Sequence, residues 1–242
     1  MTQWQNFPQM LDCPPETVHL IGISLSHTVY NDQLLCLLSS EEKQRSMQFK
    51  FEIHQRRYVM FHAFLRHVLG AYTDIKPEML EFEYGFNQKP SLKNQPELHF
   101  NLSHSEDEGI VAISSGAAIG VDIEKMKVRH MSALAERFFS PHEVGYLQSL
   151  TATEQHSAFY HLWTHKEAFI KATGFGLSQD LKRFAVGLNP SRLTHADEFN
   201  LIDWTLQSFA WREGYSSAFA VNQSVQSVHF FQYHDASFIP DK

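Results

Sequence analysis

The stretch that decides the fold is Trp163-Thr164-His165-Lys166-Glu167-Ala168-Phe169-Ile170-Lys171, together with Gly120-Val121-Asp122-Ile123-Glu124 earlier in the chain. The apolar residues of the first segment recur at helical spacing, and the second segment has the pattern of a buried strand. Between them the two segments supply carboxylates and lysines. Hard oxygen ligands beside a cation are the set that holds a divalent metal ion against a pyrophosphate.

Composition sets limits on the class of protein. The chain has 242 residues, of which 43% are hydrophobic, so it is one large globular domain or two small ones. It has no apolar run long enough to span a bilayer and no signal-peptide pattern at its start. The two cysteines, Cys13 and Cys36, are too few for a disulfide framework and fit a reducing cytoplasm. A net charge of −7 argues against nucleic acid as the main partner.

The order of patterns predicts an α+β fold. In the first half we expect helices starting near residue 39 and over 58–69, the latter ended by Gly70, and strands over residues 18–25, 80–86, 98–102 and 109–114. After Gly116 the pattern begins again, with helices over residues 131–139, from 140 and over 159–173, and strands over 119–124, 204–211, 217–221 and 225–233. We therefore expect two halves, residues 1–115 and 116–242.

The acidic strand is the first candidate site. Asp122 and Glu124 are two residues apart, so both side chains point to one face of the strand, and Val121 and Ile123 point to the other, into the core. Neighbouring acids repel, and aspartate is disfavoured inside a strand. A bound cation would remove that cost. The alternative is a solvated sheet face on which the acids are incidental.

The helix from residue 159 adds a second group of charges. Trp163, Glu167 and Lys171 follow one another at i, i+4 and i+8 along the flank of its apolar stripe, at the border where residues that line a cleft belong. The alternative is a surface ion pair worth roughly 0.2–0.5 kcal/mol. Lys166 falls within the apolar stripe and must snorkel or find an anionic partner, which favours a functional role for it.

Other motifs are weaker. Glu143 is a candidate base, but Ser140-Pro141-His142-Glu143 matches a capping box, and we favour that structural role. Ser103 and His104 follow a strand, where a hydroxyl and an imidazole can reach a phosphate, although an ordinary turn would look the same. No HExxH, GxxxxGK[ST] or GxGxxG pattern occurs, so a transition-metal site, a P-loop and a dinucleotide cradle are not expected.

Several segments together resemble one family. They are residues 100–105 (Phe-Asn-Leu-Ser-His-Ser), 120–124, 137–140 (Arg-Phe-Phe-Ser), 159–163 (Phe-Tyr-His-Leu-Trp), Lys166-Glu167 with Lys171, and 174–178 (Gly-Phe-Gly-Leu-Ser). In this order and spacing they are similar to the surfactin-synthetase-type (Sfp-type) 4′-phosphopantetheinyl transferases. The resemblance implies a pseudo-dimeric fold of two similar α+β halves with coenzyme A in the cleft between them. It also implies transfer of 4′-phosphopantetheine to a carrier-protein serine, with release of adenosine 3′,5′-bisphosphate.

The resemblance also assigns roles to residues of this chain. It implies that Mg²⁺ is held by Asp122, Glu124 and Glu167, and that Asp122 also lies against the coenzyme. It implies a phosphate contact for Lys171, and contacts to the coenzyme's phosphates, including the 3′-phosphate, for Lys89, Ser103 and His104. More loosely, it implies contacts to the same nucleotide for Arg45 and Arg57. The carrier, from fatty-acid, polyketide or nonribosomal-peptide synthesis, is expected to dock at residues 174–183, and the enzyme is expected to be a monomer.

The serine hydroxyl of a carrier is a poor nucleophile at its own pKa. We expect Glu167 to take its proton, directly or through a metal-bound water, and Lys171 to stabilise charge on the phosphoryl oxygens. Two alternatives use the same residues. One is a Mg²⁺-dependent hydrolase of nucleotide diphosphates, and the other is a non-catalytic module that binds coenzyme A or a carrier.

Overall fold

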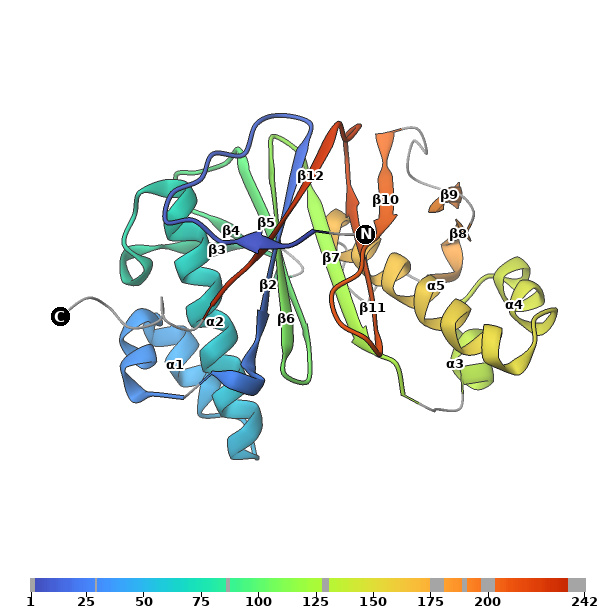
Figure 1. Cartoon of the computed structure of the whole chain (residues 1–242), viewed down its shortest axis with the longest axis horizontal. Helices are drawn as coiled ribbons and strands as arrows, with labels where there is room; N and C mark the ends of the chain where they lie inside the picture. Colours follow the sequence, from blue (N-terminus) through green and yellow to red (C-terminus); the bar gives the residue numbers. More distant parts are fainter. Residues whose placement is uncertain are drawn as a thin grey trace.

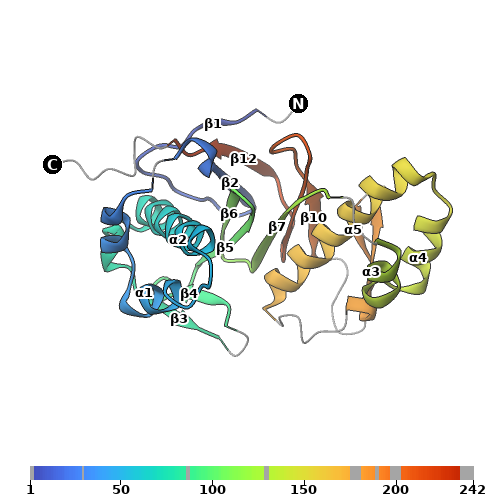
Figure 2. The same cartoon turned by 90° about the horizontal axis from the view of Figure 1, so that it is seen from below.

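Two sheets lie face to face at the centre of the molecule, and a long helix covers the outer face of each, α2 (Glu52–Thr73) on one side and α5 (Ala152–Thr173) on the other (Figure 1, Figure 2). The structure is a computed structural model and describes residues 3–28, 30–85, 88–127, 131–174, 181–188, 191–196 and 203–234. The predicted α+β class is confirmed. No helix in these ranges is both long enough and apolar enough to cross a membrane.

The larger sheet has the strand order β1-β12-β2-β6-β5, and the smaller one has the order β10-β11-β7. The strands of the larger sheet are β1 (Gln5–Asn6), β2 (Thr17–Ser24), β5 (Leu98–Ser105), β6 (Glu108–Ser115) and β12 (Ser227–Gln232). Those of the smaller sheet are β7 (Ile119–Lys125), β10 (Thr205–Ser208) and β11 (Tyr215–Val221). Two short hairpins lie apart from these sheets, β3 (Phe82–Tyr84) with β4 (Pro90–Leu92) and β8 (Phe184–Leu188) with β9 (Ser191–Ala196).

Strand periodicity creates one core between the sheets and one under each long helix. In β6, Ile110 and Ala112 face the other sheet, whereas Val111 and Ile113 face α2. Side chains of β7 such as Val121 fill the middle layer from the opposite side. This alternation of apolar residues on both faces is typical of strands that are buried on both sides.

The second half repeats the first in topology. Each has a strand, then a short and a long helix, then two further strands, and the first strand pairs with the last, which pairs with the middle one. The first set is β2, α1 (Ser40–Ser46), α2, β5 and β6, and the second is β7, α4 (Pro141–Gln148), α5, β10 and β11. The second half adds α3 (Met131–Phe138). Two similar α+β halves were therefore predicted correctly. The boundary at residue 115 stays a prediction, because β12 of the last segment joins the first sheet, parallel to β2.

Several element boundaries differ from the prediction, and the following ones have clear local causes. Helix α2 does not end at Gly70 but continues to Thr73, and Asp74 caps it with φ +55°. Helix α5 begins at Ala152, well before the predicted start, because Thr151 and Glu154 form a capping box there. Ser103 and His104 lie inside β5 and not in a turn, since β5 pairs with β6 as far as Ser105.

Candidate active site

A glycine lets α5 lie directly on β7. Gly120 faces the helix, and a Cβ atom at this position would come within 2.1 Å of the Ala168 carbonyl oxygen and 2.3 Å of the Ala172 nitrogen. No other residue allows so close an approach of the two backbones. Because strand residues two apart share a face, Asp122 and Glu124 continue the face that Gly120 presents to the helix.

Three elements meet at Asp122. Its side chain is buried, and its Oδ1 accepts hydrogen bonds from Lys171 Nζ at 2.5 Å and from Ser103 Oγ at 3.0 Å. Lys171 Nζ also donates to Ser103 Oγ at 2.9 Å. The structure therefore brings together a carboxylate of β7, an ammonium of α5 and a hydroxyl of β5. Asp122 does not lie on a solvated sheet face, and Lys171 forms this partly buried ion pair in place of a surface pair with Glu167.

Glu167 lies next to this group on the half-buried flank of α5. Burial and the negative charges of Asp122 and Glu124 raise the pKa of its carboxyl to about 7, although Lys171 acts in the opposite direction. Glu124 accepts a hydrogen bond from Ser105 Oγ at 3.1 Å. The three carboxylates therefore lie within electrostatic reach of one another, and their mutual repulsion favours an added cation.

The residues fit a magnesium ion, although they do not form a finished metal site. Within the described ranges, no three carboxylate, imidazole or thiol side chains are arranged to hold a metal. Asp122 Oδ2, however, is buried and has no hydrogen-bond partner in the structure as described. An unpartnered buried carboxylate oxygen with two further carboxylates nearby is a hard-oxygen donor set that suits Mg²⁺. The ligand assignment itself stays a prediction.

His104 of β5 lies within electrostatic reach of Lys171 and Arg57. The ring of His104 stacks on Phe61 of α2, with the ring centroids 4.5 Å apart and the planes 8° from parallel. One side of the residue is exposed, yet this contact desolvates the ring. Desolvation and the charges of Lys171, His62 and Arg57 lower the pKa of His104 to about 4. The Arg57 Nε donates to Asp107 Oδ1 at 2.8 Å.

Arg45 and Lys89 lie in other surroundings. Arg45 is exposed in the last turn of α1. Lys89 Nζ donates to the backbone oxygens of Ile119 at 2.9 Å and Ala172 at 2.8 Å, so it joins the first half to both β7 and α5. Burial lowers the pKa of Lys89 to about 8. Direct contact of either residue with a coenzyme stays a prediction.

Lys89 borders a cleft of about 360 Å³ between the two halves. One side of the cleft comes from β4, β5 and the residues before them, and the other from Ala118 and the end of α5. Its lining includes Pro90, His99, Phe100, Ala172 and Gly174. Of the predicted site residues, Lys89 lines this cleft, and Ala172 follows Lys171 directly on α5. Clefts between two halves of a molecule are common sites for small ligands.

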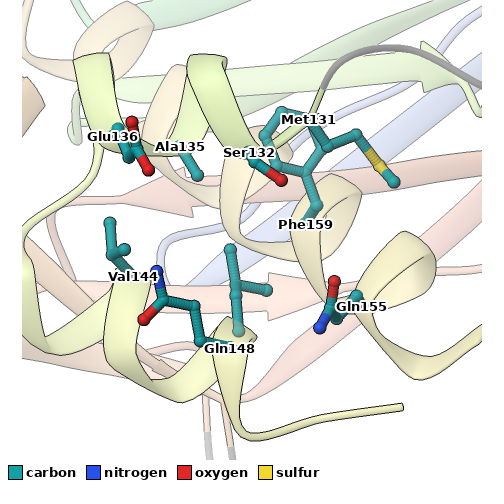
Figure 3. Close-up of a pocket in the computed structure, with 9 residues that line it drawn as sticks. Met131, Ser132, Ala135, Glu136, Val144, Gln148, Gln155 and Phe159 are labelled. Carbon is teal, nitrogen blue, oxygen red and sulfur yellow. The ribbon is translucent and has the colours of Figure 1, made fainter. Parts of the chain in front are cut away.

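A second hollow, of about 230 Å³, lies among α3, α4 and the start of α5 (Figure 3). Figure 3 shows Met131, Ala135, Val144 and Phe159 around it, with Gln148 and Gln155 at its edge. None of the candidate site residues lines it. Of these two hollows, the one between the halves contains a predicted site residue, Lys89.

Lys166 has the anionic partner that its position in the apolar stripe requires, and its contacts favour a structural role over the functional one favoured from the sequence. Its buried Nζ donates to Glu143 Oε1 at 2.9 Å and Oε2 at 2.8 Å, and to the Phe184 backbone oxygen at 2.6 Å. The predicted capping box of Ser140 and Glu143 is present as well. Glu143 is thus fully engaged in holding α4 and α5 together, which confirms the structural interpretation of this residue.

Sequence reasoning missed Asn101 and Ser105. Asn101 Oδ1 accepts from Val121 N–H at 2.9 Å, and Ser105 Oγ accepts from Lys125 N–H at 3.1 Å. The available signal was the polar residue at every second position, which marks one face of a strand. The predicted turn at Ser103 hid that alternation. Of the predicted carrier-docking segment, residues 175–180 lie outside the described ranges, whereas Gly174 caps α5 and Leu181–Arg183 form a short 3₁₀ turn.

Comparison with known proteins identifies the family of the chain. A model of the 4′-phosphopantetheinyl transferase superfamily matches residues 118–220, and a model of the N-terminal part of 4′-phosphopantetheinyl transferases matches residues 27–116. The 4′-phosphopantetheinyl transferase HetI of Nostoc sp. is 34% identical over 208 residues, which cover 83% of this chain and 87% of that protein. Sfp of Bacillus subtilis is 35% identical over 162 residues, with coverage of 66% and 70%.

The enzyme psf-1 of Bacillus pumilus is 39% identical over 158 residues, which cover 65% of this chain and 67% of that protein. The chain therefore belongs to the 4′-phosphopantetheinyl transferase family and is of the Sfp type. It is an enzyme that transfers 4′-phosphopantetheine from coenzyme A to carrier proteins. The hydrolase and the non-catalytic module are set aside as its function.

Proposed function

We propose that the transfer depends on Mg²⁺, and that Asp122, Glu124 and Glu167 hold the ion. The observation that carries the proposal is the buried Oδ2 of Asp122, which has no hydrogen-bond partner within the described residues and lies where the charges of all three carboxylates act. Bound there, the ion would neutralise these carboxylates and stabilise negative charge on the pyrophosphate of coenzyme A.

The coenzyme binds in the cleft between the halves, beside Lys89. Ser103 and His104 of β5 lie on the same side of the acids as Lys171 of α5. Lys171 Nζ is the group that reaches the phosphoryl oxygens. In the structure this ammonium pairs with Asp122 and Ser103. It is therefore already aimed at the acids and loses little side-chain freedom on binding. Arg45 and Arg57 add positive charge at the side of the first half.

The reaction replaces the phosphoanhydride bond of coenzyme A by a phosphate ester bond to the carrier serine. The hydroxyl oxygen of the carrier serine attacks the phosphorus that bears the pantetheine arm, and the bond from that phosphorus to the bridging oxygen breaks. The bridging oxygen leaves with adenosine 3′,5′-bisphosphate. Glu167 accepts the serine proton at its carboxylate, and Lys171 stabilises the charge on the phosphoryl oxygens. Position and electrostatics, more than covalent chemistry, carry the rate.

The carrier docks near residues 174–183, next to the end of α5. Its serine would then approach Glu167 and Lys171 along the helix that bears them. We propose that the enzyme acts as a monomer, because each half of the cleft comes from the same chain. The two free cysteines, Cys13 and Cys36, fit a cytoplasmic location.

Calorimetry with MgCl₂ in the presence of coenzyme A tests the metal proposal. The wild-type protein is expected to bind one equivalent of Mg²⁺, and Asp122→Asn to weaken binding by at least about tenfold, as for a lost charged ligand. Glu154→Gln, at the exposed start of α5, is the matched control and should bind as the wild type does. Undiminished binding by Asp122→Asn would contradict the ligand assignment.

A further inference from the structure

Strands β5 and β7 belong to different sheets, and side chains join them. At the middle of the molecule the two strands lie next to each other (Figure 2). Asn101 Oδ1 accepts from Val121 N–H at 2.9 Å, Ser103 Oγ from Ile123 N–H at 3.3 Å, and Ser105 Oγ from Lys125 N–H at 3.1 Å. Alternate residues of β5 thus satisfy alternate amides of β7. We call Asn101, Ser103 and Ser105 the seam residues.

The two serines of the seam also hold the acids. Ser103 Oγ donates to Asp122 Oδ1 at 3.0 Å, and Ser105 Oγ donates to Glu124 Oε2 at 3.1 Å. Each hydroxyl accepts from a backbone amide and donates to the carboxylate of the preceding residue. A hydroxyl has one proton to give and two lone pairs to accept with, so this pattern uses the donor of each serine fully.

The two acids differ in how they are held. Asp122 is buried, and Lys171 pairs with it as well as Ser103. Glu124 lies farther along β7, is partly exposed, and has a longer side chain with one more rotatable bond. Its carboxylate therefore has more rotamer freedom to lose on binding a ligand. The hydrogen bond from Ser105 restricts that freedom in advance.

We propose that Ser105 is a positioning residue that orients the Glu124 carboxylate toward the divalent cation. The inference rests on the proposed role of Glu124 as a magnesium ligand. Hydrogen bonds from neighbouring residues to a ligating carboxylate fix its orientation, and their loss costs about 10–100-fold in metal affinity. Ser105 does this from the first half of the chain, so the seam couples the alignment of the halves to the geometry of the acids.

The test is Mg²⁺ affinity by calorimetry with coenzyme A present, together with thermal unfolding. Ser105→Ala is expected to weaken Mg²⁺ binding about tenfold, while kcat at saturating Mg²⁺ stays close to the wild-type value. Ser105→Thr keeps the hydroxyl and should restore the affinity. Ser105→Cys keeps a side chain of similar volume but has a poorer hydrogen-bond donor, so it should bind Mg²⁺ as weakly as Ser105→Ala. It replaces Ser105→Ala in the test if the alanine variant does not fold.

Ser114→Ala is the matched control. Ser114 lies on the neighbouring strand β6, is fully buried, and donates to the Ala117 backbone oxygen. Its loss should lower the unfolding temperature without a change in Mg²⁺ affinity. If Ser105→Ala behaves in the same way, with a lower unfolding temperature and wild-type Mg²⁺ affinity, Ser105 is only structural and the proposal is wrong.

The variant Glu124→Gln distinguishes the role of Glu124 as a magnesium ligand from the role of Ser105 in positioning its carboxylate. Weaker Mg²⁺ binding by Glu124→Gln, with no further loss when Ser105→Ala is added, is the expected result, because the serine acts through this carboxylate. Weaker binding by Glu124→Gln beside wild-type binding by Ser105→Ala overturns the positioning role alone. Wild-type binding by Glu124→Gln overturns the ligand assignment of Glu124 and the positioning role with it.

Discussion

The two halves of the molecule hold their helices with the same device. In the first half, Arg66 of α2 donates from Nε to Glu42 Oε2 at 2.8 Å, and Glu42 is the capping-box residue of the short helix α1. In the second half, Lys166 of α5 pairs with Glu143 at 2.8 Å, and Glu143 is the capping-box residue of α4. All four side chains are buried. We therefore interpret the ion pair between a capping glutamate and a cation of the next long helix as a contact that stabilises the fold and takes no part in the reaction.

The halves differ on the strand that faces the long helix. In the first half, β2 presents Ile21 and Ile23 to the apolar core beneath α2. In the second half, β7 presents Gly120, Asp122 and Glu124 to α5. The same arrangement of strands and helices therefore encloses an apolar core in the first half and holds charged side chains in the second. The comparison favours a structural role for the buried ion pairs present in both halves, and it supports the proposal that the acids of β7, present in one half, form the active site.

The largest expected effect is on stability and comes from breaking the buried ion pair between Glu143 and Lys166. Glu143→Gln leaves the Lys166 ammonium buried without a counter-charge, which should cost about 3–5 kcal/mol of unfolding free energy. The double variant Glu143→Leu with Lys166→Met should recover most of the loss. Urea unfolding measures both. The transfer rate per folded molecule should remain that of the wild type, and a large fall in that rate would return Lys166 or Glu143 to the chemistry.

Glu167→Gln is expected to act in the opposite way. Turnover should fall by at least about a hundredfold, the scale for loss of an acid–base group. The protein should remain as stable as the wild type or become more stable, because a neutral amide does not carry the charge that burial and Asp122 oppose. Initial rates of carrier modification and thermal unfolding measure the two effects. Near-wild-type turnover would remove Glu167 from the mechanism.

Lys171→Ala should weaken coenzyme A binding by about tenfold, as expected for loss of one hydrogen bond between charged groups. The matched control is Lys93→Ala, since Lys93 forms an exposed ion pair with Glu81 away from the acids. Binding titrations with each variant give the comparison. Equal coenzyme affinity in Lys171→Ala and Lys93→Ala would count against a phosphate contact.

The smallest expected effect is a pH dependence of stability that comes from His19 in the first half. Burial and the nearby His229 lower the pKa of His19 to about 4, against an opposing effect of Asp12, and His19 Nδ1 forms a 2.7 Å hydrogen bond with the Tyr72 hydroxyl. Below the ordinary histidine pKa, the unfolded chain binds a proton that folded His19 does not. Stability is therefore lost as pH falls from about 6.5 toward 4, by about 1 kcal/mol at pH 5.5. Urea unfolding should show a shallower loss in His19→Asn, and an unchanged slope would exclude His19 as the cause.

The periodicity of apolar residues predicted most of the helices and strands, and residue spacing predicted which charged side chains share a face. Asp122 and Glu124 were placed on one face of β7 from their two-residue spacing, and Gly120 explains why α5 lies against that face. The partner of Lys166 was not predictable, because a residue 23 positions away supplies it. Pairing between distant segments depends on tertiary packing, which local patterns do not contain.

The seam between the sheets was missed for a related reason. Ser103 and Ser105 were assigned to a turn because serine and aspartate, here Asp107, are common in turns. Their partners are backbone amides of β7, in another sheet, and nothing in a single strand pattern indicates that contact. The resemblance likewise gave Arg45 and Lys89 contacts to the same coenzyme, whereas the structure gives them different surroundings.

The most direct test of the central claim is intact-protein mass spectrometry of an apo carrier protein incubated with this enzyme, coenzyme A and Mg²⁺. The account predicts that the carrier gains one phosphopantetheine group, that a chelator abolishes the gain, and that Asp122→Asn loses it while Glu143→Gln, assayed under conditions where it is folded, retains it. Undiminished transfer by Asp122→Asn, or transfer that persists in chelator, would contradict the claim that the charges unique to the second half form the active site.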